Sequence, residues 1–144
     1  IDFVIALVLL FGLMAWFRIT PTVWAPLIPF LALLMVITAA GTGMWLTALG
    51  VQYRDVKYMV SLALQIVMYA SPVVYPASLI PDHYRLVYAL NPMVGVIEGF
   101  RSALLGTTAM PFDLIAVSTL SATGIMISGT LYFRRTERIF ADVV

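Results

Sequence analysis

Long windows without a single charged side chain are the feature that most limits what this chain can fold into. The windows 58–75 and 114–133 contain no Asp, Glu, Lys or Arg, and the stretch between Arg18 and Arg54 is apolar to about Val51. A helix needs about 20 apolar residues to cross roughly 30 Å of hydrocarbon. These windows therefore predict membrane-spanning helices.

The composition agrees with a membrane-embedded chain. Of the 144 residues, 62% are hydrophobic and 10% are charged, whereas soluble domains average roughly 45–50% and 25%. Too few polar side chains remain to cover a water-facing surface, and a disordered chain would need the opposite composition. The net charge of +1 supplies no positive field for nucleic acid. We therefore expect one all-α integral membrane domain over residues 1–144, with the membrane as its partner and no nucleic acid.

Four transmembrane helices are expected in this domain. The first would cover 3–17, and its 15 residues are too few to span comfortably unless the helix begins before Ile1. The chain is therefore expected to be a fragment that lacks upstream helices. The second helix would end at about Val51, and the third and fourth would fill 58–75 and 114–133.

The segment 76–113 is neither polar enough for an ordinary loop nor apolar for long enough to cross the bilayer. Within it, Asn91 followed by Pro92 is the favoured chemistry for starting a helix, and Gly106 is suited to end one after Leu105. At 1.5 Å per residue such a helix would be about 21 Å long, too short to span. We expect a re-entrant helical hairpin here, on the extracytoplasmic side.

The basic residues predict the orientation. Five of the eight lie where the chain would reach the same side as its two ends, and three lie on the other side. Because Lys and Arg are enriched in cytoplasmic loops, both ends, including the tail 134–144, are expected in the cytoplasm. The hairpin would then lie outside the cytoplasmic (inner) membrane. The five basic residues are Arg54, Lys57, Arg134, Arg135 and Arg138.

Groups that could carry out bond chemistry are nearly absent from the predicted spans. The one histidine, His83, lies in the hairpin without a second ligand at a metal-site spacing. No G-x-x-x-x-G-K-[ST] phosphate loop occurs in the sequence. We expect neither an enzyme, nor a metal site, nor a directly bound cofactor. Any use of ATP would occur on another subunit.

Two groups of charged residues each fit two interpretations. Glu98 and Arg101 are three residues apart, so on a helix they can pair. A charged pair on so apolar a helix is costly unless it faces protein, water or ligand. It fits a role in a transport pathway or gate, and equally a structural internal pair. In the predicted cytoplasmic turn, Arg54, Asp55 and Lys57 fit contact with a soluble partner, and equally helix capping, with Asp55 capping the third span.

Aromatic residues and prolines mark further candidates. Trp45, Tyr69 and Tyr75 could stack on sugar rings if they line a conduit, although packing against lipid or core also fits each of them. Pro72 and Pro76 are expected to kink or end the third span near its outer edge, where a hairpin could hinge.

Small residues four apart predict close helix approach. Ala39, Gly43 and Thr47 have this spacing in the second span, and Gly124 and Ser128 have it in the fourth. The pattern fits packing within the chain as well as a dimer seam.

Three short motifs follow one another along the chain. They are Y-R-D at 53–55, S-P-V-V-Y-P at 71–76 and N-P at 91–92, with Arg101 nine residues after that last proline. In this order and spacing they resemble the C-terminal part of type-2 ABC exporter permeases. The nearest branch exports O-antigen, capsule and teichoic acid polysaccharides. The chain is similar to spans three to six of such a permease, which has six.

The resemblance implies a permease that pairs with a second copy and is driven by two separate ATPase subunits, which use ATP and Mg on the cytoplasmic side. Its cargo would be a lipid-linked glycan, and the external hairpin would shape the outer exit. The residues that would belong to that exit are Asn91, Pro92, Glu98 and Arg101, and those of the cytoplasmic turn are Arg54 and Asp55.

Two alternatives stay open at this point. A permease for small lipophilic drugs would share the fold and differ in the width and lining of its conduit. A membrane scaffold without transport activity is the other, and the costly pair of Glu98 and Arg101 argues against it.

Overall fold

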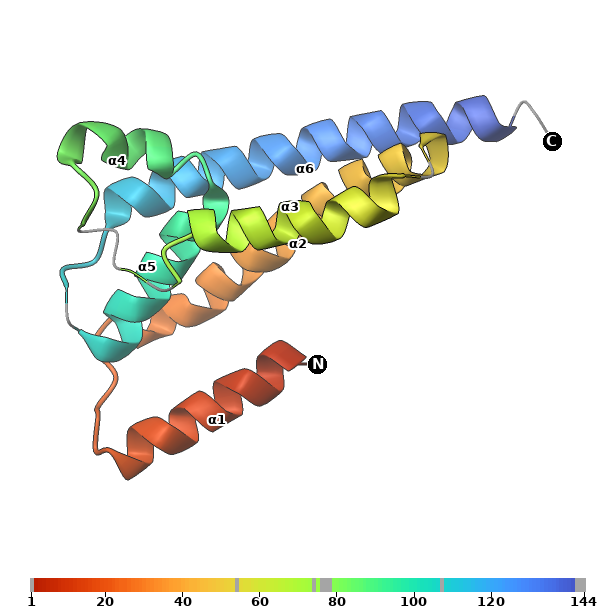
Figure 1. Ribbon diagram of the computed structural model, residues 1–144. Coiled ribbons are helices and arrows are strands. Elements are labelled where there is room, and N and C mark those ends of the chain that lie inside the picture. Colours follow the sequence, from red (N-terminus) through yellow and green to blue (C-terminus); the bar gives the residue numbers. More distant parts are fainter. Residues whose placement is uncertain (1, 54, 74, 76–78, 107, 142–144) are drawn as a thin grey trace.

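The computed structural model describes residues 2–53, 55–73, 75, 79–106 and 108–141, and every regular element in these ranges is a helix (Figure 1). Successive long helices reverse direction: α1 and α3 run one way, and α2 and α6 run the other. The short helices α4 and α5 lie together at one end of this arrangement. The elements are α1 (Asp2–Trp16), the 3-10 turn η1 (Ala25–Leu27), α2 (Ile28–Gln52), α3 (Val56–Ala70), α4 (Asp82–Tyr88), α5 (Pro92–Leu105) and α6 (Phe112–Ala141).

The two longest helices, α2 and α6, pack closely because glycines face each other across their contact. An added Cβ at Gly41 would lie 2.8 Å from the backbone of Met126, and one at Gly129 would collide with the carbonyl of Gly41. Small residues at such crossings let two backbones approach within van der Waals range. Both helices are also long and apolar enough to cross a membrane.

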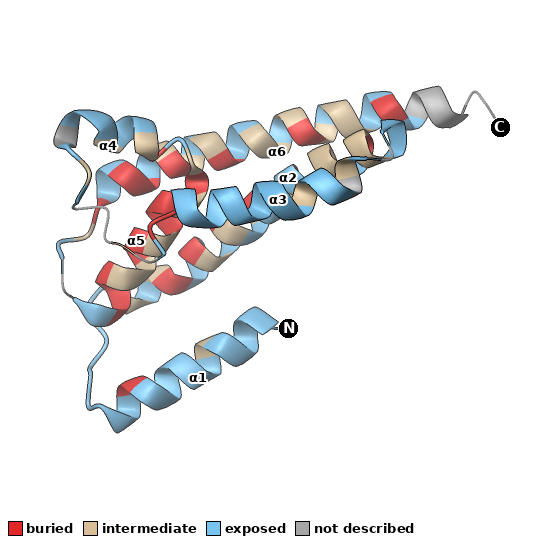
Figure 2. Ribbon diagram, in the orientation of Figure 1, coloured by how far each residue is buried: buried red, intermediate tan, exposed pale blue. Residues whose placement is uncertain are grey.

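Helix α5 packs against both α2 and α6 and contributes to each of the buried hydrophobic clusters. Ala89, Val94 and Leu114 form one buried cluster, and Leu34, Val96 and Ala122 form another. Figure 2 shows the buried residues gathered on α5 and on the neighbouring parts of α2 and α6. Because two long helices hold α5, other segments can contact a helix that is fixed in place.

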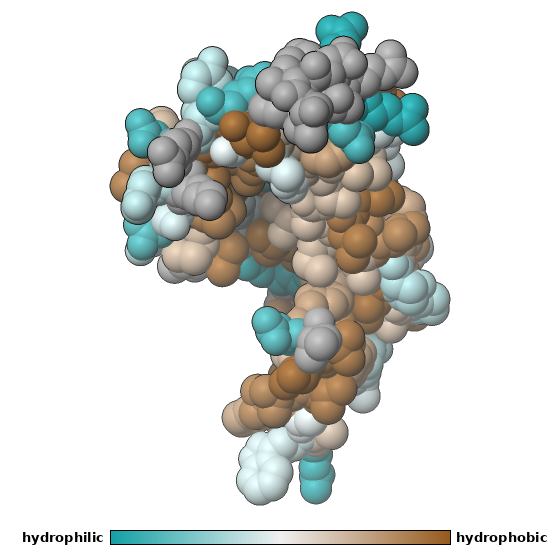
Figure 3. Space-filling view, turned by 90° about the vertical axis from the view of Figure 1, so that its right-hand side faces the viewer, coloured by the Kyte–Doolittle hydropathy of each residue, from teal (hydrophilic) through white to brown (hydrophobic). Residues whose placement is uncertain are grey.

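Helix α1 is mostly exposed and contacts the other helices near both of its ends. Its one buried residue among those described, Met14, packs with Ile28, Ala103 and Leu104. Near the other end, Phe3 meets the ring of Phe100 edge-on at 6.1 Å between centroids. In the space-filling view (Figure 3), α1 is the hydrophobic column that projects at the bottom. An apolar surface of this kind belongs in lipid or against other protein.

The helix boundaries confirm some expectations and correct others. Helix α5 has the predicted bounds, with Asn91 as its N-cap and Gly106 in the left-handed conformation at φ 63°. The predicted third span 58–75 is too long, because α3 ends at Ala70, where extended Ser71 precedes a proline. The predicted fourth span is too short, since α6 continues as a helix into the tail that follows residue 133.

The span lengths support part of the predicted topology. Helices α2 and α6 meet the length and composition of a membrane span, whereas α1 and α3 are apolar but have 15 residues each. The described residues therefore form an all-helical fold in which two helices are long and apolar enough to cross a membrane.

The small-residue pattern does not mark the contact inside the chain. A Cβ on Gly43 or Gly124 would meet nothing within 4 Å, and Ala39 and Thr47 are exposed. Packing within the chain was wrong for these four residues, because the α2 face that meets α6 is the one carrying Gly41. The fifth predicted residue, Ser128, does meet α2, since it accepts a hydrogen bond from Trp45. The seam with a second copy stays a prediction.

Gly41→Ala is expected to lower the midpoint of thermal unfolding, because overpacking of a close helix contact costs about 1–3 kcal/mol. Gly43→Ala is the matched control in the same helix. With open space around it, this substitution should gain about 1 kcal/mol of helix propensity and keep or raise the midpoint. Unfolding of both variants in one detergent checks the prediction, and equal losses would contradict the glycine contact.

Candidate functional site

Asn91 joins the start of α5 to the end of α3. Its Oδ1 accepts a hydrogen bond from the backbone N–H of Met93 at 3.1 Å, which caps the helix. Its Nδ2 donates to Oγ of Ser71 at 3.0 Å, and that hydroxyl donates to the carbonyl of Val67 at 2.8 Å. One amide side chain therefore caps the first turn of α5 and also holds the residue that follows α3 by a hydrogen bond.

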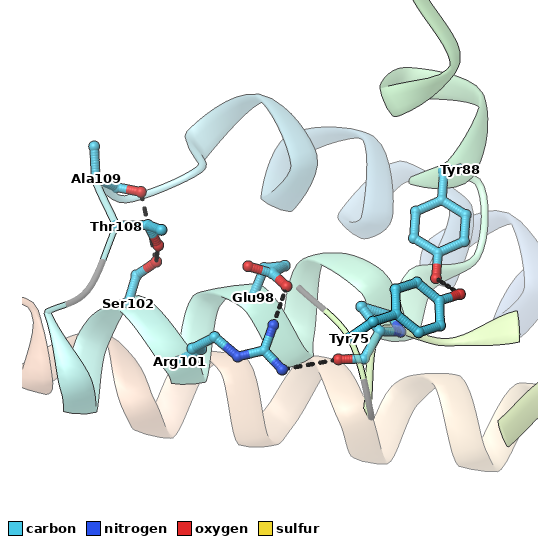
Figure 4. A network of polar contacts seen from close by, with 8 residues as sticks. Tyr75, Tyr88, Glu98, Arg101, Ser102, Thr108 and Ala109 are labelled. Carbon is cyan, nitrogen blue, oxygen red and sulfur yellow. Dashed lines mark hydrogen bonds and ion pairs between the residues drawn. The ribbon is translucent and has the colours of Figure 1, made fainter. Parts of the chain in front are cut away.

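Arg101 makes a second link between the same two segments. Its Nη1 pairs with Oε1 of Glu98 one turn earlier on α5, and its Nη2 donates to the backbone carbonyl of Pro72 at 3.0 Å (Figure 4). Glu98 is 6% exposed. A buried carboxylate needs a counter-charge, and a guanidinium can satisfy it while still donating elsewhere. The pair thus serves as an anchor for the carbonyl of Pro72.

Two tyrosines make the third link. The hydroxyls of Tyr75 and Tyr88 lie 2.8 Å apart, and the hydroxyl of Tyr75 also donates to the carbonyl of Tyr69 at 3.2 Å. Burial raises the pKa of Tyr88 above its ordinary value, and the bond to Tyr75 and the charge of Glu98 raise it further. The Tyr88 hydroxyl therefore stays protonated at neutral pH and remains available as a hydrogen-bond donor.

These links bring together two of the three sequence motifs, S-P-V-V-Y-P and N-P, with the pair of Glu98 and Arg101 and with Tyr88. We call them the hairpin cluster, since α4 and α5 provide one side of it and the segment after α3 provides the other. Pro92, predicted for the same site, is buried as the first residue of α5. Tyr69 contributes its carbonyl, and 68% of its surface is exposed. The hairpin cluster consists of Ser71, Pro72, Tyr75, Tyr88, Asn91, Glu98 and Arg101.

Two members of the hairpin cluster were missed by sequence reasoning. Ser71 stands beside the predicted Pro72 in the S-P-V-V-Y-P motif, but nothing in that motif indicates its bond to Asn91. Tyr88 lies in no motif, and its role arises because α4 folds back to face Tyr75.

Trp45 lies apart from the hairpin cluster, between α2 and α6. Its ring stacks on Tyr132 with centroids 4.5 Å apart and planes 17° apart, and its Nε1 donates to Oγ of Ser128 at 3.1 Å. The structure shows Trp45 packed between two helices, and it shows these contacts in support of packing over stacking on a sugar ring.

The structure describes part of the predicted cytoplasmic turn between α2 and α3. Arg54 lies outside the described residues, and so does the side chain of Lys57. Asp55 precedes α3 as predicted, but its side chain makes no cap bond, and its carbonyl accepts from Tyr58 instead. The expected side-chain cap is therefore wrong, whereas the exposed carboxylate of Asp55 is left facing outward.

The far end of α5 is closed by hydroxyl groups. Thr22 donates to the carbonyl of Ala103 at 2.7 Å, and the N–H of Gly106 donates to the carbonyl of Ser102 at 3.1 Å. The hydroxyl of Ser102 bonds in turn to that of Thr108 at 3.0 Å (Figure 4). The last carbonyls of a helix need such partners in an apolar setting. Both ends of α5 are thus capped. Among the described residues, no three His, Cys, Asp or Glu side chains gather as a metal site would require.

Comparison with known proteins gives this architecture a family. The model of the family described as ABC-2 type transporter matches residues 1–105. The chain belongs to the ABC-2 type transporter family. The matched stretch ends where α5 ends, so the hairpin cluster lies wholly inside this ABC-2 region. Membership in this family makes the chain part of a membrane protein.

Curated relatives point to one branch of the ABC-2 family. A Klebsiella pneumoniae protein named O-antigen export system permease protein RfbA is 23% identical over 129 residues, 89% of this chain and 49% of the relative. A Myxococcus xanthus protein of the same name is 29% identical over 147 residues, 99% of this chain and 56% of the relative. The chain spans about half the length of the curated relatives it matches.

Removing one member of the charged pair is expected to cost more than removing both. Arg101→Gln leaves the carboxylate of Glu98 buried with fewer donors, and breaking a buried pair in this way costs about 3–5 kcal/mol. The double variant Glu98→Gln and Arg101→Gln leaves no buried charge and should recover part of that loss. Thermal unfolding of the single and double variants measures the difference, and strictly additive losses would contradict an internal pair.

The two bonds of Asn91 can be separated by substitution. Asn91→Ser keeps an N-cap oxygen but cannot reach Ser71, so its stability should match that of Ser71→Ala. Asn91→Ala also loses the cap and should be less stable by about 1 kcal/mol. The three unfolding midpoints check this order, and an Asn91→Ala variant no weaker than Asn91→Ser would refute the capping role.

Proposed function

We propose that this chain is part of the permease subunit of an ABC exporter that moves a lipid-linked polysaccharide of the O-antigen type across the cytoplasmic membrane. The carrying observation is that relatives named as O-antigen export permeases align with 89% and 99% of the chain. The ABC-2 family supplies the transporter class, and the names of the relatives supply the substrate class.

The proposed topology has four crossings, with the hairpin outside and both ends of the segment in the cytoplasm. The alternating directions of α1, α2, α3 and α6 support it, since each crossing must reverse the last (Figure 1). The basic residues near the ends of α2 and α6 support the same orientation through the positive-inside rule.

Transport in this proposal uses no bond chemistry on the permease. ATP and Mg are used by a separate ATPase subunit, which is consistent with a sequence that has no phosphate loop. A second copy of the permease completes the conduit. In this proposal the exposed turn at Asp55 contacts the ATPase, and Arg54 and Lys57 are its basic candidates from the sequence.

The hairpin cluster is proposed to shape the outer exit of this conduit. Polar groups at membrane depth are costly, and here a buried carboxylate, a guanidinium, an amide and hydroxyls meet at one place. The exposed ring of Tyr69, beside this cluster, provides a face for a sugar ring.

Stimulation of ATP hydrolysis tests the substrate class. The full-length permease with its ATPase in lipid nanodiscs is expected to hydrolyse ATP faster when lipid-linked polysaccharide is added, because a transporter couples the two events. Small hydrophobic amines, added separately, should have no such effect.

Each other result has a definite meaning. Stimulation by the amines alone would reassign the permease to drug export. A complex that hydrolyses ATP under neither condition would favour the scaffold and overturn the proposal.

A further inference from the structure

Helix α3 is exposed along its length and buried just beyond its end. Every residue from Ser61 to Ala70 is exposed, whereas Ser71 is 4% exposed and Pro72 is fully buried. Of the described residues between 53 and 80, these two are the ones that are buried. The structure thus buries the segment just beyond the outer end of α3 and leaves residues 61–70 of the helix exposed within this chain (Figure 2).

Besides the burial of Pro72, polar contacts hold the outer end of α3. Asn91 bonds to the hydroxyl of Ser71, Arg101 bonds to the carbonyl of Pro72, and Tyr88 bonds to the hydroxyl of Tyr75. In Figure 4 the Arg101 and Tyr88 side chains reach this segment from α5 and α4. Hydrogen bonds can be exchanged for bonds to water or to sugar hydroxyls at little net cost, whereas close apolar packing cannot.

The other side of these contacts is rigid. The N–H of Gly95 donates to Oγ of Ser118 on α6 at 3.0 Å, and Gly99 lies against the side chain of Leu31 on α2. Helix α5 therefore cannot shift without disturbing both long helices. Exchangeable polar contacts therefore join the fixed helix α5 to the segment that follows the exposed helix α3, and we call this set of contacts a clasp.

The backbone beyond α3 is suited to a pivot. Ser71 is extended, with φ −97° and ψ 149°, and the proline after it removes a backbone donor. Hinges are typically a few residues at the ends of elements. The break between Ala70 and Pro72 therefore separates the helix from the clasped segment.

Resting on the proposed function, we propose that Ser71 and Tyr88 are positioning residues of a polar clasp that fixes the outer end of α3 to the hairpin and must open for cargo to pass. Arg101 and Asn91 complete the clasp from α5. Movement of α3 relative to the fixed α5–α6 unit is then the step that opens the outer exit.

Covalent locking tests the clasp directly. In a full-length permease with its other cysteines replaced, Ser71→Cys and Asn91→Cys are combined and bridged by oxidation or by a short bis-thiol reagent. The natural segment offers a clean background, since it contains no cysteine. The oxidised form is expected to lose export of lipid-linked polysaccharide, and cleavage of the bridge by a reductant should restore it.

A matched bridge in the fixed part provides the control. The hydroxyl of Thr130 lies 3.4 Å from Sδ of Met44, so Met44→Cys with Thr130→Cys joins α2 to α6. This bridge should leave export unchanged, because these helices stay together in the proposed cycle. Full export through the Ser71–Asn91 bridge would overturn the clasp.

A distance measurement covers the case in which the bridged variant fails to fold, and it requires no glycan. Spin labels at the exposed positions Ile66 on α3 and Leu120 on α6 should move apart by several ångströms when ATP is trapped. Labels at Leu33 on α2 and Leu120 should keep their distance. An unchanged Ile66–Leu120 distance would reject the clasp.

Tyr88→Phe and Tyr84→Phe link the movement to the clasp itself. Tyr88→Phe removes one bond and should increase the population with the labels apart before ATP is added, whereas Tyr84→Phe, on the exposed side of the same helix, should not.

If the labels move with ATP but polysaccharide does not stimulate ATP hydrolysis, the clasp stands and the assigned cargo is rejected. If polysaccharide drives ATP hydrolysis and the labels do not move, the assigned cargo stands and the clasp is rejected.

Discussion

The insertion of α5 against α2 and α6 is the contact on which the other parts of the structure depend. It is possible because Gly95 and Gly99 remove the side chains that would hold the helices apart. A helix of 14 residues is too short to cross a bilayer by itself. Packed between two long helices and capped at both ends, it can nonetheless sit at membrane depth without unsatisfied backbone groups. The hairpin cluster then has a rigid side from which to act.

The polar side chains of the hairpin cluster follow the same constraint. In apolar surroundings each buried donor or acceptor needs a partner, and here each bond of the cluster also joins two segments. Asn91 caps α5 and grips Ser71, and Arg101 compensates Glu98 and holds the carbonyl of Pro72. The same few groups therefore stabilise α5 and position the segment that follows α3. This explains how a chain with 10% charged residues can still build a specific polar site.

Membership in the ABC-2 family gives this arrangement a context. The family match covers α1 to α5, and the relatives named for O-antigen export align over nearly the whole chain. The chain spans about half of those relatives, so the conduit, its partners and its cargo belong to the larger assembly that we propose. Within the segment itself, the exposed body of α3 and its buried outer end form the contrast from which a moving part can be inferred.

The sequence by itself determined the all-helical membrane character, because charge-free windows of this length suit helices, which satisfy their own backbone groups in lipid. It also determined both ends of α5, since Asn-Pro and a left-handed glycine act through local chemistry that needs no distant partner. The ends of α3 and α6 were harder to predict, because apolar composition continues past the point where Pro72 stops one helix and the tail extends the other. Only the tertiary structure decided which glycines touch, since Gly41 and Gly43 differ by the helix face that meets α6. It also decided that Tyr88 and Ser71 belong with Arg101, because contacts between segments far apart along the chain arise from packing and leave no mark in local spacing.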